Sequence, residues 1–108
     1  ALVDIESLKL IYYTLLALTK KSIPNRLVRR IFELKLMTIN GEYDLTPGLK
    51  DKTALYTWEY IIYSKPEKLF TFVITEEALT EIEKYMDIMI RKYIDRHFHS
   101  LDILEDIL

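Results

Sequence analysis

Residues 75–97 read TEEALTEIEKYMDIMIRKYIDRH, the most regular amphipathic helical pattern in the chain. Thr75 is a good N-cap, and Glu76 and Glu77 in the first turn favour the positive end of the helix dipole. Apolar side chains recur every three or four residues and predict a seam that packs on neighbouring helices, comprising Leu79, Ile82, Met86, Met89, Tyr93 and His97. The stretch therefore predicts a long helix of a packed all-α domain.

A second helix is predicted over residues 25–40, NRLVRRIFELKLMTIN. Pro24 fits its first turn, and Asn40 followed by Gly41 suits a left-handed C-cap. On a helical wheel its apolar side chains cover well over half of the circumference, so we expect it to be the most buried helix. The remaining stripe, predicted to be a narrow basic edge at the surface, holds Arg26, Arg29, Arg30 and Glu33.

A third helical pattern covers residues 4–21, with Asp4 as its N-cap. Apolar side chains lie on both of its faces: Ile5, Leu8, Tyr12, Leu15 and Leu16 on one, and Leu10, Tyr13 and Ala17 on the other. A helix that is apolar on both sides is normally buried on both sides, which favours a central core helix. The alternative is that this segment, cut from a longer protein, has lost its cover.

The remaining segments complete the predicted fold. Residues 42–52 are expected to form a loop, and residues 53–65 fit a helix better than a strand, although their aromatic and β-branched content suits both. Residues 68–74 suit a short helix followed by an extended piece, and a last short helix is predicted over 101–108. The expectation is an all-α, compact bundle of about five helices in a single domain, residues 1–108.

Composition bounds the class of function. The 15 Lys and Arg residues against 17 Asp and Glu give a formal net charge of -2, which argues against a dedicated polyanion binder because such affinity scales with the phosphates neutralised. The absence of cysteine excludes a disulfide scaffold and a cysteine zinc site. No apolar run reaches the roughly 18 residues that a membrane span needs. We therefore expect a soluble domain with no membrane partner.

Sequence signatures of an enzyme are missing. The chain has no glycine-rich phosphate loop, no nucleophile elbow and no histidine pair at i, i+4. His97 and His99 are two residues apart, so on a helix they point about 200° away from each other and cannot chelate one ion. We expect no catalytic residues, no metal, no cofactor and no small-molecule substrate.

Cationic side chains are the candidates for binding. Arg26, Arg29 and Arg30 share one stripe, and Lys35 falls within the apolar arc of the same helix. Lys35 either extends its ammonium to the edge, pairs with a local carboxylate, or is a cation beside an apolar pocket. Such a group is either a solvated face or an anion-binding site. The second alternative is open because a planar guanidinium can bind a carboxylate or a phosphate with two hydrogen bonds. A second basic group, near the end of the 75–97 helix, comprises Arg91, Lys92 and Arg96.

Residues 28–45, VRRIFELKLMTINGEYDL, resemble the C-terminal helical domain of the RecO family of bacterial recombination mediators. The residues that match the family pattern, in order, are Arg29 or Arg30, Phe32, Glu33, Leu34, Lys35, Leu36, Met37, Gly41 and Tyr43. Residues 75–104 are similar to that family's long final helix and its closing Ser-Leu tail, and residues 7–20 fit the preceding helix. The resemblance covers nearly the whole chain.

The chain departs from the family pattern in two ways. Many family members carry zinc-binding cysteines in the loop after the Gly-Tyr pair, whereas residues 42–65 contain none, so no zinc is carried over. The family also has an N-terminal oligonucleotide-binding barrel, and no strand-rich segment of that size exists here. The resemblance thus implies a C-terminal fragment of a longer protein whose barrel is absent.

The resemblance implies a non-enzymatic role in DNA repair and homologous recombination. RecO works with RecR to load recombinase onto single-stranded DNA coated by the single-stranded DNA-binding protein, and it anneals complementary strands. Its helical domain is implied to dock the C-terminal tail of the single-stranded DNA-binding protein, while single-stranded DNA contacts mainly the missing barrel. The implied location is the bacterial cytoplasm, at the nucleoid.

The docked tail is acidic and ends in an apolar residue, so its receptor needs a hydrophobic groove beside cations. Our hypothesis is that the tail carboxylates are bound by Arg26, Arg29, Arg30 and Lys35, and that the groove is formed by neighbouring side chains such as Tyr12. Nucleic-acid binding is assigned to Arg91, Lys92 and Arg96. A competing hypothesis is a helical interaction or dimerisation module whose apolar surfaces meet another copy. A third, direct nucleic-acid binding, requires both basic groups to merge into one face.

Overall fold

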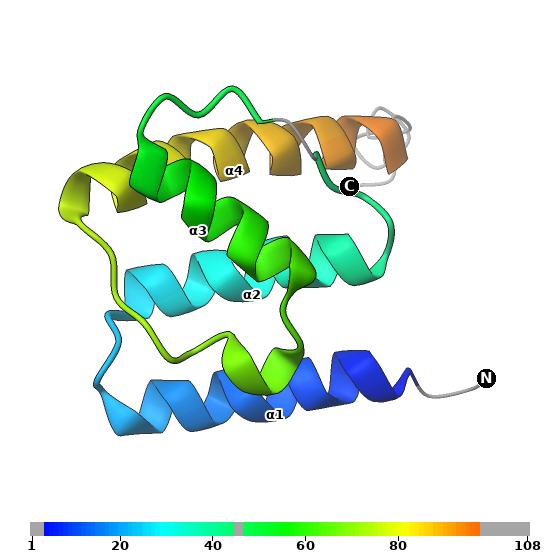
Figure 1. The fold of residues 1–108 in the computed structure, drawn as a ribbon. Helices are drawn as coiled ribbons and strands as arrows, with labels where there is room; N and C mark the ends of the chain where they lie inside the picture. The colour runs from blue at the N-terminus through cyan, green and yellow to red at the C-terminus, as the bar shows by residue number, and fades with distance from the viewer. Residues whose placement is uncertain (1–3, 45–46, 98–108) are drawn as a thin grey trace, which may run out of the picture.

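The computed structural model describes residues 4–44 and 47–97 (Figure 1). Within these residues lie the helices α1 (Ile5–Lys20), α2 (Asn25–Ile39), α3 (Lys52–Tyr63) and α4 (Glu76–His97), with the 3-10 turn η1 (Pro66–Lys68) between α3 and α4. The described residues contain no strand, which confirms the all-α prediction, and the segment predicted over 53–65 is helical as far as Tyr63. They hold four α-helices rather than about five, because residues 68–74 form no α-helix and the helix predicted over 101–108 lies outside the described residues.

The ends of the helices follow the capping signals in the sequence. Asp4 Oδ1 accepts a hydrogen bond from the Glu6 amide at 3.0 Å, and Thr75 Oγ1 accepts one from the Ala78 amide at 3.2 Å. After α2 the backbone enters the left-handed region at Gly41, with φ of 76°, where a residue with a Cβ is strained. These local interactions satisfy backbone groups that a helix end leaves unpaired.

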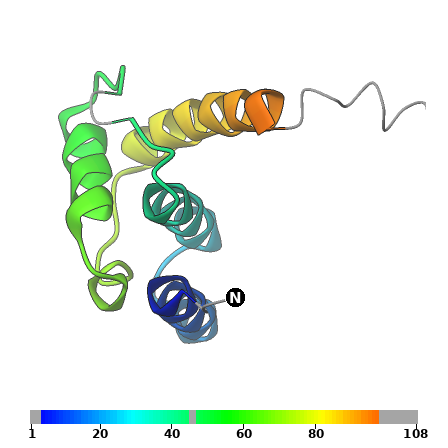
Figure 2. The same ribbon diagram turned by 90° about the vertical axis from the view of Figure 1, so that its right-hand side faces the viewer.

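The central helix is α2, which contacts α1, α3 and α4. Figure 2 shows α3 on one side of α2, with α1 and α4 flanking it and the opposite side uncovered by the described residues. The inward side chains of α2 are essentially inaccessible to solvent, namely Leu27, Val28, Ile31 and Leu34. They form the centre of the core with side chains from the neighbouring helices, namely Trp58, Ile61, Ile82 and Met86. The broad apolar arc of residues 25–40 thus finds partners on three sides.

The prediction that the first helix is a central core helix is wrong. α1 lies at the edge of the domain, packed on α2 and η1 (Figure 1). Leu10 and Ala17 are buried against these neighbours, whereas four apolar side chains on the opposite side are more than half exposed: Ile5, Leu8, Tyr12 and Leu15. The central place is taken by α2, whose apolar arc is wide enough to serve three neighbours at once.

A hydrogen-bonded junction fixes the α2–α3 connection onto the core. The Trp58 indole Nε1 donates to the Asp44 carbonyl at 2.8 Å, and the Tyr85 hydroxyl donates to the Asp44 carboxylate at 2.5 Å. The two aromatic rings meet edge to face with centroids 5.1 Å apart. Burial and the hydrogen bond to Asp44 raise the pKa of Tyr85. Asp44 is therefore held by side chains from both α3 and α4.

Candidate functional site

The predicted arginine stripe of α2 faces the acidic N-terminal half of α4. Arg26 Nη1 lies 2.5 Å from Glu76 Oε1, and its Nη2 lies 2.6 Å from Glu83 Oε1. These hydrogen bonds, that to Glu83 foremost, raise the pKa of Arg26, and the same contact lowers the pKa of Glu83. Arg26 therefore links α2 to α4 within the domain.

The prediction that Arg30 belongs to a surface edge is wrong, because its side chain is only 7% exposed. Its Nη1 lies 2.9 Å from Glu33 and 3.0 Å from Asp87, and its Nε lies 3.8 Å from Glu83. Burial alone lowers the pKa of Arg30, but the hydrogen bonds and charges of Glu33 and Asp87 outweigh it and the pKa is raised. Arg30 holds α2 and α4 together from within their interface.

Arg29 alone of the three arginines remains largely exposed, at 65%, with an i, i+4 contact to Glu33 of 3.2 Å. It is spaced i, i+3 and i, i+7 with Phe32 and Leu36, so the three side chains share one strip of α2. Phe32 and Leu36 are partly buried and pack on the edge of the core. We call Arg29, Phe32 and Leu36 the α2 outer strip; it combines one accessible cation with apolar surface.

Lys35 is buried, at 4% exposure, and its ammonium donates to the Ile62 carbonyl at 3.1 Å. The sequence left three alternatives for the environment of the Lys35 ammonium, and the structure shows a fourth. The ammonium lies at the C-terminal end of α3, where the helix dipole favours positive charge. Burial lowers the pKa of Lys35, and the nearby charge of Glu6 acts in the opposite direction. Its place in the α1–α2–α3 junction keeps Lys35 from the surface where a partner would bind.

The buried ammonium predicts a specific dependence of stability on pH. Because the folded pKa of Lys35 lies below its ordinary value of 10.5, the folded state binds fewer protons than the unfolded state in the interval between the two pKa values. Wild-type stability should therefore rise with pH through this interval relative to the Lys35→Met variant. Urea denaturation of both proteins from pH 7 to pH 11 measures this difference. A pH-independent difference would contradict the prediction.

The other predicted residues are not brought into one site. Tyr12 is 60% exposed on the outer side of α1, where its ring contacts Tyr13 edge to face. Arg91 and Lys92 are exposed on the C-terminal half of α4, and Arg96 there forms an ion pair with Glu42.

The two predicted basic groups lie at opposite ends of the α2–α4 pair. The α2 arginines meet Glu76, Glu83 and Asp87, whereas Arg96, about 20 Å further along α4 than Glu83, meets the segment after α2. The carboxylate of Asp87 lies between the two groups along α4. The structure therefore does not form the single basic face that direct nucleic-acid binding requires.

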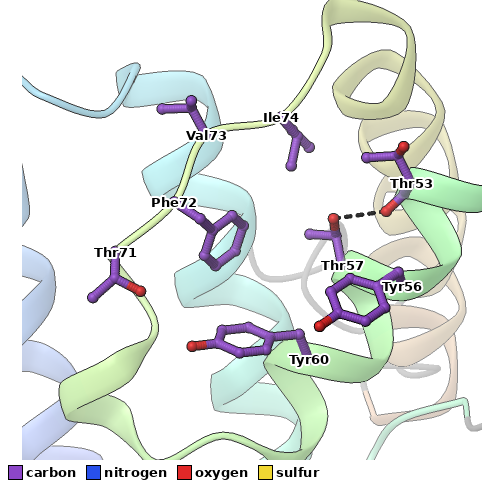
Figure 3. A pocket seen from close by; sticks show the side chains of 8 residues that line it. All are labelled: Thr53, Tyr56, Thr57, Tyr60, Thr71, Phe72, Val73 and Ile74. Atoms are coloured by element: carbon purple, nitrogen blue, oxygen red, sulfur yellow. Dashed lines mark hydrogen bonds between the residues drawn. The ribbon is translucent and has the colours of Figure 1, made fainter.

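Sequence reasoning missed a cavity of about 340 Å³ between α3 and the extended segment before α4 (Figure 3). Its lining residues are Thr53, Tyr56, Thr57, Tyr60, Thr71, Phe72, Val73 and Ile74. The hydroxyls of Thr57 and Tyr60 already donate to backbone carbonyls, so the cavity presents mainly apolar surface. In the sequence its lining is marked only by threonines beside aromatic residues, at Tyr56–Thr57 and Thr71–Phe72. The lining includes no charged side chain and no nucleophile paired with a base.

The described residues form an all-α domain, and residues 4–44 and 47–97 contain no group of three or more His, Asp or Glu side chains that could hold a metal ion. His97 ends α4, and His99 lies outside the described residues. None of the described helices combines the length and apolar character that crossing a membrane demands. In comparisons with known proteins, no family model, no curated protein and no solved structure matches the chain.

Proposed function

We propose that this chain is the helical docking domain of a RecO-type recombination mediator, without catalytic activity of its own. Its ligand is the acidic C-terminal tail of the single-stranded DNA-binding protein, and its role is to bring the mediator, with RecR, to coated single-stranded DNA. The sequence resemblance over residues 28–45 and 75–104 supports this proposal. The observation that carries it is the α2 outer strip, where an accessible arginine lies beside partly buried apolar side chains.

The chemistry of the α2 outer strip suits such a tail. A guanidinium that is 65% exposed can exchange Glu33, a carboxylate that it shares with Arg30, for a peptide carboxylate at low cost, because exposed ion pairs contribute little. Phe32 and Leu36 supply apolar surface for the last residue of the tail. Arg26 and Arg30 are already paired with four carboxylates of the domain, so in this proposal they position α2 and Arg29 binds the ligand.

The proposal predicts that Arg29→Ala weakens binding of a labelled acidic peptide ending in Asp-Ile-Pro-Phe by roughly ten-fold, the effect of losing about 1.4 kcal/mol. Fluorescence anisotropy at low and moderate salt measures the affinity. Deleting the terminal Phe of the peptide should weaken binding further, since it removes the apolar contact. The fold should be unaffected, because Arg29 makes only a surface ion pair.

Arg91→Ala is the matched control, because it removes the same charge from an exposed position on α4. Its peptide affinity should equal that of the wild type. Equal losses in Arg29→Ala and Arg91→Ala would indicate attraction by net charge alone and would overturn the site. Failure of the folded wild-type domain to bind the peptide would overturn the function.

A further inference from the structure

Six large apolar side chains lie on the side of α1 that faces away from the core, and together we call them the α1 outer face. Its members, with their exposures, are Ile5 (68%), Leu8 (51%), Ile11 (45%), Tyr12 (60%), Leu15 (58%) and Leu18 (40%). They form a continuous arc of the helix, because they recur at intervals of three and four residues. Nothing among the described residues covers this arc, since α1 packs on α2 and η1 through its other side.

An apolar face of this size is typical of an interaction surface. The six side chains expose on the order of 600 Å², at the upper end of the largest apolar patch on a typical monomer. A standard protein interface buries about 800 Å² per partner, so one helix packed on this face accounts for most of a modest interface.

The positions of the six side chains are symmetric about the middle of α1. Ile5 and Leu18 lie equally far from the midpoint between residues 11 and 12, as do Leu8 and Leu15, and Ile11 and Tyr12 adjoin it. An antiparallel copy of the same helix therefore places each apolar side chain opposite an apolar side chain. This self-complementarity is what a two-fold interface requires, because each partner presents the same patch.

The charges at the two ends of α1 favour the same arrangement. Asp4 caps the first turn and Lys21 caps the last, whereas Glu6 lies on the other side of the helix, near Lys35. In an antiparallel pair the acidic end of one helix lies beside the basic end of the other, and the opposite ends of the two helix dipoles are adjacent. A parallel pair places like charges together at both ends.

From these observations we infer that the α1 outer face binds a second copy of this chain, forming a two-fold dimer through antiparallel α1 helices. The α2 outer strip lies on another helix, and none of its three residues belongs to the proposed dimer face. The small area predicts dissociation at micromolar rather than nanomolar concentration. Each dimer would present two α2 outer strips.

The first experiment is sedimentation velocity of the 12.9 kDa chain from 1 to 300 μM. The wild type should pass from monomer to dimer within this range. Leu8→Glu should remain monomeric at every concentration, because the new carboxylate cannot be buried in the interface. Ile88→Glu is the matched control, since Ile88 is 52% exposed but lies on α4; this variant should dimerise like the wild type.

The second experiment tests the orientation of the helices by disulfide cross-linking, which the absence of native cysteine makes unambiguous. The Ile11→Cys thiol lies next to its counterpart in the antiparallel pair, so this variant should cross-link rapidly under mild oxidation. The Ile5→Cys thiol lies about 20 Å along the axis from its counterpart, so this variant should not cross-link. Circular dichroism of each variant confirms that the fold is kept.

The outcomes decide the inference. A monomeric wild type at 300 μM overturns the dimer and leaves the α1 outer face to a helix of different sequence. Dimerisation that Ile88→Glu abolishes and Leu8→Glu preserves places the interface on α4. Cross-linking at Ile5 as rapid as at Ile11 overturns the antiparallel arrangement. Peptide binding by a monomeric Leu8→Glu variant would leave the proposed function intact, so the two proposals fail separately.

Discussion

Replacing Trp58 by alanine should lower the free energy of unfolding by about 3–5 kcal/mol. Its side chain is fully buried, contacts the Tyr85 ring, and donates the hydrogen bond to Asp44 that holds the α2–α3 connection. Domains of this size have a total stability of about 5–15 kcal/mol, so the variant should be close to unfolding at room temperature.

Urea denaturation followed by far-UV circular dichroism measures this loss, because Trp58 is the single tryptophan and its fluorescence disappears with the substitution. Tyr56→Ala is the control: Tyr56 also belongs to α3 but is 70% exposed, so its truncation should change stability little. Trp58→Phe should fall between the two, since it keeps a buried ring but leaves the Asp44 carbonyl without its donor. A Trp58→Ala variant as stable as Tyr56→Ala would contradict the packing described above.

The Arg30→Met substitution should lower the free energy of unfolding by about 2–3 kcal/mol. Removing one partner of a buried ion pair is strongly destabilising because the remaining charges keep their desolvation cost, and the exposure of Asp87 moderates the loss here. Methionine retains the apolar stem of the arginine, so the loss reports on the guanidinium rather than on a cavity. Arg29→Ala, by contrast, should leave the free energy of unfolding nearly unchanged, because it removes an exposed guanidinium from the same helix.

The pH dependence of the stability difference between the wild type and Arg30→Met shows whether charge or packing causes it. The pKa of Glu83 is lowered in the folded state by the hydrogen bond from Arg26 and also by the charge of Arg30, so this stabilisation is present above the ordinary pKa of 4.5 and is lost as the pH falls through the folded pKa. Urea denaturation should show the full gap between wild type and Arg30→Met at pH 7 and a smaller gap at pH 3. A gap that persists in acid would assign the effect to packing instead of charge.

Local signals in the sequence predicted the helical segments well. Asp4, Thr75 and Gly41 act where their side chains or backbone freedom can satisfy the unpaired groups of a helix end, and such effects depend on a few neighbouring residues. The ambiguous segment 53–65 shows the limit of this reasoning, because aromatic and β-branched residues suit both a helix and a strand. Its local pattern favoured a helix only narrowly, and the structure adds the packing of this helix on α2 and α4, which local pattern does not reveal.

The candidate site was predicted only in part for the same reason. The sequence placed Arg26, Arg29 and Arg30 on one stripe, since helical spacing alone determines which residues share a face. It could not show that α4 brings Glu76, Glu83 and Asp87 against that stripe, because these carboxylates lie about fifty residues away in the chain.

Amino-acid order alone thus established an all-α domain, the caps of its helices, and the apolar and basic faces of each helix, because these properties arise within a few turns of chain. Tertiary structure decided the rest: that α2 is central and α1 peripheral, that Arg30 and Lys35 are buried, and that Arg29 remains accessible. Whether a face is covered depends on which other helix packs against it, and that is a property of the assembled core.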